Sequence, residues 1–205
     1  MKQMFTAFTA FTALAVIAAP ATAAAVVGQP APNFVAADVN GKPVRLADFR
    51  GKTVVLEWNN PGCPFVQKHY NSGNMQKAQA AAAKNGVVWL TINSGAPGKE
   101  GHMTGAEAKA FVAKSGAKPT AYLLDPRGVV GKAYEAKTTP HMYIVNKSGT
   151  LVYAGGIDDK PTSSAADIKG ARNHVLAAIS ELQAGKAVSV ATSRPYGCAV
   201  KYSDS

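Results

Sequence analysis

The sequence predicts an α/β fold with a mixed central sheet flanked by helices. Three observations lead to this prediction. Short apolar segments alternate with helical segments from residue 53 to residue 134, which is typical of parallel β-α-β units. Strand segments before and after this region, over residues 34–46 and 141–154, add antiparallel hairpins. A final amphipathic segment supplies one more helix to cover the sheet.

The expected strands share runs of apolar, β-branched or aromatic residues between turn residues, and cover 34–39, 43–46, 53–58, 87–92, 121–124, 141–145 and 150–154. The expected helices have helical periodicity or capping signals, and cover 63–84 with an interruption at 71–74, 104–115, 129–134 and 172–183. Asn40-Gly41 suits the first hairpin turn. Thr104 and Glu107 form a capping box, and Asn74 is expected to cap the second half of the first helix.

Composition narrows the class of protein. With 47% hydrophobic residues, 17% charged residues and 31 Gly and Pro together among 205, the chain is neither collagen-like nor a long coiled coil. Its formal charge of +10 comes from scattered lysines and arginines, without a run of four and without interleaved aromatic residues. We therefore expect a solvated basic surface and no nucleic-acid partner.

Residues 1–23 are expected to be a secretory signal peptide. Lys2 is followed by an uncharged apolar stretch, and Ala21-Thr22-Ala23 is a small-x-small cleavage site. The stretch is about 16 residues long, which is short for a membrane span. Cleavage would remove one lysine and no acidic residue, taking the charge from +10 to +9. We expect an exported protein, periplasmic or extracellular, that starts at Ala24 and works where a disulfide persists.

Cys63 is the first candidate for chemistry. It stands where a buried strand gives way to a helix, and Pro64 fits the first turn of that helix. A helix N-terminus offers unpaired N–H groups and a positive partial charge, which favour the thiolate form. A small buried cysteine without chemistry is the alternative. The position favours a reactive thiol.

The segment Leu56-Glu57-Trp58-Asn59-Asn60-Pro61-Gly62-Cys63-Pro64-Phe65 resembles the active-site loop of thioredoxin-fold proteins. More closely, it resembles the peroxiredoxin-like branch of the alkyl hydroperoxide reductase/thiol-specific antioxidant (redoxin) superfamily. The similarity also includes residues 28–34, Thr139-Pro140, residues 155–159, residues 185–188 and Gly197-Cys198-Ala199-Val200-Lys201-Tyr202. It implies a thioredoxin-like fold with an N-terminal hairpin and a C-terminal extension. It divides the mature chain into a redoxin domain over 24–185 and a tail over 186–205 that carries Cys198.

The sequence departs from this family pattern at the reactive loop. Many relatives carry Cys-x-x-Cys, and here Asn60 takes the first position and Cys63 the second. True peroxiredoxins are expected to carry Thr or Ser three residues before the cysteine and an arginine near the strand after Pro140. Asn60 replaces the hydroxyl residue, and Thr138 to Tyr143 contain no arginine. Dithiol exchange within one loop is therefore excluded, and peroxide reduction lacks two supports.

Cys198 offers a second thiol. The tail that carries it is able to fold back over the loop, so Cys198 is expected to pair with Cys63 in an exported protein. The pair is interpreted as redox-active, with Cys63 the nucleophile and Cys198 the resolving partner. A purely structural disulfide in a non-catalytic binding module is the alternative. A copper carrier is a weaker one, because Cys63 and His141 give too few soft ligands for a closed metal site.

The resemblance also assigns the surroundings of the cysteine. Thr139-Pro140 resembles the cis-proline that faces the cysteine in thioredoxin folds, and only proline makes a cis bond accessible at low cost. Asn60, Pro61 and Gly62 shape the loop and, with Thr139 and Pro140, are expected to contact substrate. Trp58, Trp89 and Phe65 are interpreted as core residues. The favoured function is thiol–disulfide exchange or thiol-dependent peroxide reduction without a cofactor, with a thiol donor, a disulfide-bearing protein or a peroxide as partner.

Overall fold

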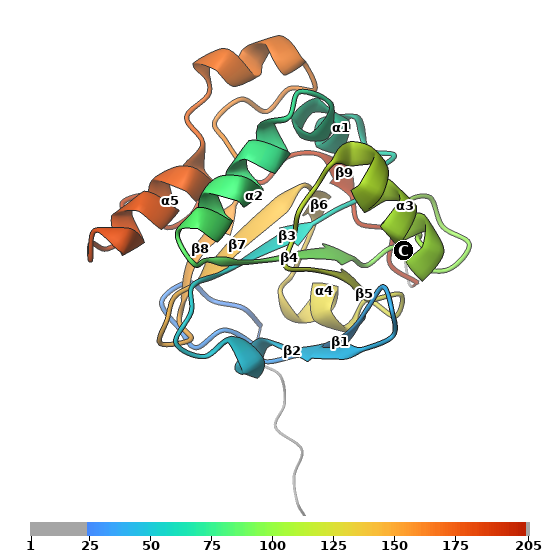
Figure 1. Ribbon diagram of the computed structural model, residues 1–205, viewed down its shortest axis with the longest axis horizontal. Helices are drawn as coiled ribbons and strands as arrows, with labels where there is room; N and C mark the ends of the chain where they lie inside the picture. Colours follow the sequence, from blue (N-terminus) through green and yellow to red (C-terminus); the bar gives the residue numbers. More distant parts are fainter. Residues whose placement is uncertain (1–23, 204–205) are drawn as a thin grey trace, which may run out of the picture.

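The computed structural model describes residues 24–203, so the predicted signal peptide lies outside the described residues. Seven strands form a central sheet in the order β2-β1-β5-β4-β3-β7-β8 (Figure 1). Their bounds are β1 Val35–Asp38, β2 Pro43–Arg45, β3 Val54–Trp58, β4 Val88–Asn93, β5 Ala121–Leu124, β7 His141–Val145 and β8 Leu151–Gly155. A separate two-stranded sheet joins β6 (Thr138–Thr139) to β9 (Cys198–Ala199).

The sheet is mixed, as the sequence predicts. β3 runs parallel to β4, and β4 runs parallel to β5. β7 runs antiparallel to β3 on the other side, with His141 opposite Trp58, and β8 returns antiparallel beside β7. The expected first hairpin also forms, and β1 joins it to the main sheet by pairing antiparallel with β5.

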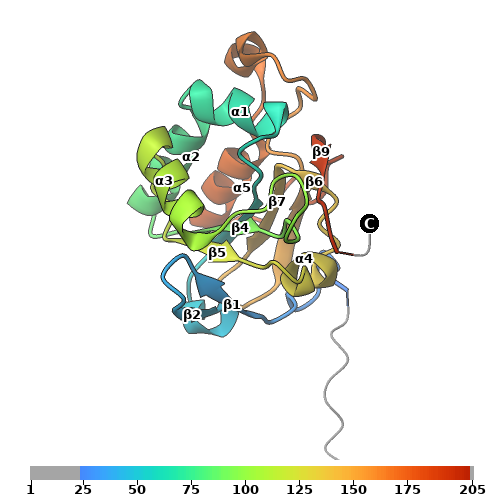
Figure 2. The ribbon, with the colours of Figure 1, turned by 90° about the vertical axis from the view of Figure 1, so that its right-hand side faces the viewer.

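Helices cover both faces of the sheet. The helices are α1 Pro64–Asn71, α2 Asn74–Lys84, α3 Gly105–Ser115, α4 Val129–Ala133 and α5 His174–Gln183, with short 3-10 turns at Leu46–Phe49 and Ala165–Gly170. α1, α2 and α5 pack on one face around a buried cluster that includes Val55 and Trp89. α4 and the N-terminal segment cover the other face around Leu56 and Trp58 (Figures 1 and 2).

The alternation along β3 therefore sorts side chains between two cores. Leu56 and Trp58 face one cluster, and both are fully buried. Val55 faces the other cluster. Glu57 lies on the same side as Val55, where it meets α1, and this position decides its hydrogen bonding below.

Helix starts differ from the sequence prediction in two places. Asn74 is the first residue of α2 instead of its cap, because Gly73 takes the N-cap position with a left-handed φ of 74°. α5 begins at His174 instead of Arg172, because the Asn173 side chain accepts a hydrogen bond from Leu176 N at 2.9 Å. The capping box of Thr104 and Glu107 is confirmed.

The C-terminal tail crosses the end of the sheet beside α1. Figure 2 shows β9 next to β6, at the edge of the molecule where α1 begins. In register, Cys198 lies opposite Thr139 and Ala199 opposite Thr138. The tail thus reaches the segment that precedes Pro140.

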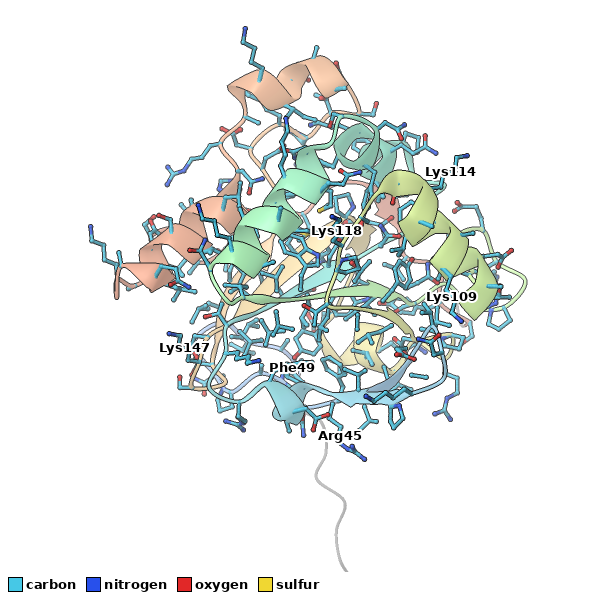
Figure 3. The ribbon with its side chains drawn as sticks, in the orientation of Figure 1. Arg45, Phe49, Lys109, Lys114, Lys118 and Lys147 are labelled. Atoms are coloured by element: carbon cyan, nitrogen blue, oxygen red, sulfur yellow. The ribbon has the colours of Figure 1, made fainter. Side chains whose placement is uncertain are left out.

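Basic side chains are spread over separate elements. Figure 3 places Lys109 and Lys114 on α3, Lys147 at the turn between β7 and β8, and Arg45 at the end of β2. Within residues 24–203, no helix is long and apolar enough to cross a bilayer.

Candidate active site

Cys63 occupies the N-cap position of α1. Its backbone is extended, with φ −74° and ψ 125°, and Pro64 begins the helix as the sequence predicts. Cys63 N–H donates to Asn60 O at 3.0 Å, which closes the preceding turn. The Cys63 side chain is only 1% exposed and lies in the core cluster beneath α1. The thiol therefore sits at the positive end of a helix, shielded from solvent.

Asn60 shapes the loop before Cys63. Its Oδ1 accepts a hydrogen bond from Gly62 N at 2.9 Å, and its Nδ2 donates to Glu100 Oε1 at 3.0 Å. Asn60 is buried, Pro61 is half-buried and Gly62 is exposed. The position of the missing first cysteine is therefore filled by a side chain whose amide is already engaged, with Gly62 in the same loop and with Glu100 in the loop after β4.

Thr139 and Pro140 face Cys63, as the sequence predicts. The Thr139–Pro140 peptide bond is cis. The Cys63 thiol donates to Thr139 O at 3.1 Å. Thr139 is buried, and its strand edge is occupied by β9. The backbone that the sequence assigns to substrate binding is thus paired with the protein's own tail.

The structure brings the two cysteines together. Cys198 N–H donates to Cys63 Sγ at 3.4 Å, and both side chains are free thiols. Thr139 Oγ1 donates to Cys198 O at 3.4 Å. Burial, together with the hydrogen bond and charge of Cys63, raises the pKa of the Cys198 thiol to about 12. Cys198 therefore holds its proton at neutral pH in the dithiol.

A buried polar cluster fastens the tail two residues before Cys198. Tyr196 OH donates to Asp158 Oδ1 and lies 3.2 Å from His69 Nε2. Asp158 Oδ2 lies 3.8 Å from Lys68 Nζ, and Lys68 also donates to the backbone oxygen of Lys160 at 2.8 Å. This Asp158 cluster (Lys68, His69, Asp158 and Tyr196) ties α1 to the chain after β8 and to the tail.

His69 has a role here that the sequence interpretation missed. It is fully buried, and Asn74 Nδ2 lies 2.8 Å from its Nδ1. Burial lowers the pKa of His69 to about 4, against the opposing attraction of Asp158. The only sequence signal of this cluster is two polar residues, Lys68 and His69, placed between the buried Val66 and Tyr70.

His141 does not join Cys63. Its Nδ1 accepts from Lys137 N at 3.3 Å and lies 3.1 Å from Tyr143 OH, and its ring packs on Tyr143. Burial lowers the pKa of His141 to about 4. Across the described part of the chain, no three His, Cys, Asp or Glu side chains meet in a group suited to a metal ion.

A second polar cluster lies beneath α1 around Glu57. Its two carboxylate oxygens accept hydrogen bonds from four side chains: Tyr70 OH at 2.7 Å, Asn59 Nδ2 at 3.2 Å, Trp89 Nε1 at 2.8 Å and Thr91 Oγ1 at 3.1 Å. Burial raises the pKa of Glu57 in spite of these four donors. Trp89 and Trp58 are core residues, as predicted, and Phe65 packs edge-on against Tyr196 of the tail.

Comparison with known proteins adds the family. The model of the AhpC/TSA family matches residues 27–154, which is more than half of the chain and includes Cys63. The chain belongs to the AhpC/TSA family. The match ends before Asp158 and the tail. Cys198 therefore lies outside the part of the chain that matches the family.

Curated relatives of this AhpC/TSA protein are thiol-disulfide oxidoreductases. ResA of Bacillus thuringiensis subsp. konkukian is 28% identical over 127 residues, covering 62% of this chain and 67% of ResA. ResA of Bacillus subtilis is 29% identical over 132 residues, covering 61% and 64%. The relatives thus support the redox class, whereas the peroxiredoxin-like branch has no match among them.

Two crystal structures share the fold over more of the AhpC/TSA chain. A hypothetical protein from Sinorhizobium meliloti 1021 has a TM-score of 0.73 at 26% identity, covering 88% of this chain and 96% of its own. A conserved protein from Geobacillus kaustophilus has a TM-score of 0.72 at 28% identity, covering 88% and 94%. A thiol:disulfide interchange protein DsbE from Chlorobium tepidum, at 22% identity and a TM-score of 0.52, supports the thioredoxin-like fold alone.

Proposed function

We propose that the protein is an exported thiol–disulfide oxidoreductase that cycles between a Cys63–Cys198 disulfide and the dithiol. One observation carries the proposal: Cys198 N–H lies 3.4 Å from Cys63 Sγ, in a tail strand paired with Thr139. A short local movement of the two side chains brings their sulfurs into bonding range. The second thiol therefore comes from the tail, whereas the family resemblance implies a Cys-x-x-Cys pair within one loop.

The position of Cys63 at a helix start supports it as the nucleophile of the pair. Its side chain lies at the N-cap of α1, at the positive end of the helix, although it makes no cap hydrogen bond. Cys198, whose pKa is raised by burial and by Cys63, keeps the proton. This division of roles is the one expected of a nucleophile and its resolving partner.

Thiol–disulfide exchange is favoured over peroxide reduction. The position three residues before Cys63 holds Asn60, whose amide is engaged with Gly62 and Glu100. No arginine occurs in Thr138 to Tyr143, and Cys63 is 1% exposed. Peroxide activation thus lacks both the hydroxyl and the cation that the family pattern places beside the thiolate.

The proposal is tested with the purified protein in both redox states. A non-reducing peptide map of the oxidised protein should show Cys63 and Cys198 linked within one chain, and Cys63→Ser should abolish exchange with a disulfide substrate. Cys198→Ser should undergo one oxidation and then stop as a mixed disulfide or sulfenic acid. Two freely alkylated thiols after oxidation contradict the proposal. N-terminal sequencing of exported material tests export, with Ala24 as the expected first residue.

A structural disulfide is the second candidate, and the anchoring of the tail favours it. Such a bridge should resist glutathione, with a potential below about −300 mV, whereas a redox-active one equilibrates with it. The reduction potential, measured in glutathione buffers, separates the two.

A further inference from the structure

A groove with a volume of about 420 Å³ lies between α1 and α3, beside the loop that carries Cys63. This volume is within the usual range for sites that take a ligand. Apolar side chains form one part of the groove and polar side chains the other. The residues that line it are Pro61, Val66, Gln67, Tyr70, Asn71, Phe111, Lys114 and Ser115.

The apolar part of the groove has a fixed support. The rings of Tyr70 and Phe111 pack with their centroids 4.9 Å apart, and Tyr70 OH donates to the buried Glu57 at 2.7 Å. Val66 and Tyr70 are buried, whereas Phe111 is half-buried. Phe111 therefore offers part of its ring to a bound side chain while Tyr70 holds that ring in place.

The groove is joined to the reactive loop by Gln67. The Nε2 of Gln67 donates to Pro61 O at 3.0 Å, and its backbone N–H donates to Cys63 O at 2.9 Å. Val66 follows Cys63 by three residues, which is less than one turn of an α-helix. A partner seated in the groove therefore contacts the loop within one helical turn of Cys63.

This side of the loop is also the one that the tail leaves uncovered. On the other side, β9 pairs with β6, and Cys63 Sγ lies 3.1 Å from Thr139 O and 3.4 Å from Cys198 N. Among residues 186–203, none lines the groove. A partner protein that arrives from solvent thus finds the groove open, whereas the backbone edge at Thr139 is already paired.

The charge beside the groove is positive. Lys114 lies at its rim in the last turn of α3, is exposed, and makes no ion pair within residues 24–203. Lys109 on the same helix and Lys118 just after it add positive charge on this side of the molecule (Figure 3). No acidic side chain of the described chain lines the groove. The rim therefore favours an anionic group next to the apolar one.

We propose that this groove docks the protein partner of the exchange reaction, through a segment in which an apolar side chain adjoins an acidic one. The apolar side chain packs on Phe111, and the carboxylate meets Lys114. The inference rests on the proposed thiol–disulfide function, and it adds the surface and the chemistry by which a partner is selected. Selection then takes place on α1 and α3, apart from Thr139 and Pro140.

Docking is measured first, with fluorescently labelled peptides that contain no cysteine, so that binding is separated from exchange. The probes are short peptides that alternate leucine with glutamate, leucine with lysine, or serine with glutamate. We expect the leucine–glutamate peptide to bind about five-fold or more tightly than either of the others. Equal binding of the lysine peptide, or no binding of any peptide, overturns the inference. Displacement by octanoate as effective as by the peptide assigns the groove to small carboxylic acids and also overturns it.

Lys114→Glu reverses the charge at the rim and should reverse the preference. Binding of the leucine–glutamate peptide should weaken about five-fold or more, and binding of the leucine–lysine peptide should tighten. Lys84→Glu is the matched control, because Lys84 is an exposed lysine in the last turn of α2 and does not line the groove. Asn71→Trp adds a large ring at the exposed edge of the groove and should weaken binding of both leucine peptides. An equal loss in Lys84→Glu, or no change in Lys114→Glu and Asn71→Trp, overturns the inference.

Exchange is measured second, with the same peptides carrying one cysteine as a mixed disulfide with mercaptoethanol. Lys114→Glu should raise KM for the leucine–glutamate peptide about five-fold with kcat unchanged, and should lower KM for the leucine–lysine peptide. If no peptide disulfide is exchanged while the cysteine-free peptide still binds, the proposed function fails and the docking site stands. If all peptides are exchanged with the same KM, the docking site fails and the proposed function stands.

Discussion

Two buried carboxylates beneath the same helix, those of Glu57 and Asp158, are stabilised by different kinds of neighbour. Glu57 accepts four hydrogen bonds from neutral donors on β4, α1 and the loop after β3. Asp158 faces two basic side chains, Lys68 and His69, and its Oδ2 has no hydrogen bond within residues 24–203. The first carboxylate is satisfied by its neutral neighbours, and the second depends on the basic side chains, on Tyr196 and on the backbone N–H of Lys160.

The difference follows the boundary of the family match. Glu57 and all four of its partners lie within residues 27–154. Asp158 and Tyr196 lie beyond it, and they connect α1 to the tail. The Glu57 cluster therefore lies wholly within the part that matches the family, whereas the Asp158 cluster holds the tail that carries Cys198. Substitutions in the two clusters should separate global stability from tail attachment.

Glu57→Ala should have the largest effect. It leaves four buried donors without an acceptor, which should lower the free energy of unfolding by about 4 kcal/mol or more. Urea denaturation measures this change. Glu57→Gln keeps the shape and one acceptor, so its loss should be smaller. Equal stability of wild type and Glu57→Ala would show that the cluster is not a structural unit.

Asp158→Ala should release the tail and leave the core folded. Removing the carboxylate leaves the buried Lys68 without a counter-charge, with only Lys160 O as acceptor, and Tyr196 with only His69, for a loss of about 3 kcal/mol. Hydrogen exchange should accelerate in residues 186–203 more than in β3 and β4, and Cys63 should alkylate faster. Uniform acceleration over the whole chain contradicts the division between the clusters.

His69 should make tail attachment sensitive to pH. Its pKa is about 4 in the folded protein against an ordinary 6.5, with Asp158, Lys68, Tyr196 and Asn74 around it. Above pH 6.5 the imidazole is neutral in both states. As pH falls from 6.5 towards 4, only the unfolded chain takes up the proton, so stability falls, by about 2 kcal/mol between pH 7 and pH 5.

His69→Gln isolates this contribution. His141 has a similarly lowered pKa, and the raised pKa of Glu57 acts with the opposite sign, so wild type alone sums several groups. The difference in urea midpoint between wild type and His69→Gln should be largest above pH 6.5. It should shrink as pH falls to 5. A difference that stays constant with pH rules out His69 as the titrating group.

Tyr196→Phe should give the smallest change. It removes one hydroxyl and keeps the ring against Phe65, at a cost of about 1 kcal/mol. Alkylation of Cys63 should rise only modestly, well below the rise in Asp158→Ala. Tyr202→Phe, which loses the bond to Ala136 O beyond Cys198, is the matched control for a tail hydroxyl outside the cluster.

Local sequence patterns predict most strands of the sheet and, in the site, the position of Cys63 at a helix start. A few adjacent residues are enough to predict each of these features: the strand segments, the Asn40-Gly41 hairpin, the capping box at Thr104 and the helix start at Cys63. Thr139–Pro140 is predicted by resemblance and is cis in the structure. These features depend on short-range chemistry, which a single sequence displays.

The pairing of the tail strand β9 with β6 is not predicted by any local pattern. β9 is two residues long and pairs through backbone groups, which every sequence has, so no pattern specifies β6 as its partner. The residues around His69 do not predict that its ring meets Tyr196, which lies 127 residues later in the tail. The approach of Cys198 to Cys63 was expected, whereas the side-chain contacts that hold the tail, such as that of His69 with Tyr196, escaped prediction.

The covering of Cys63 by the tail also has a consequence in time. Cys198 follows Cys63 by 135 residues, so a ribosome that adds 5–20 residues per second makes it roughly ten seconds later. Throughout that interval the nascent chain carries Cys63 with no strand over it and no partner thiol. The order of synthesis thus lets a thiol or oxidant meet Cys63 before the tail covers it.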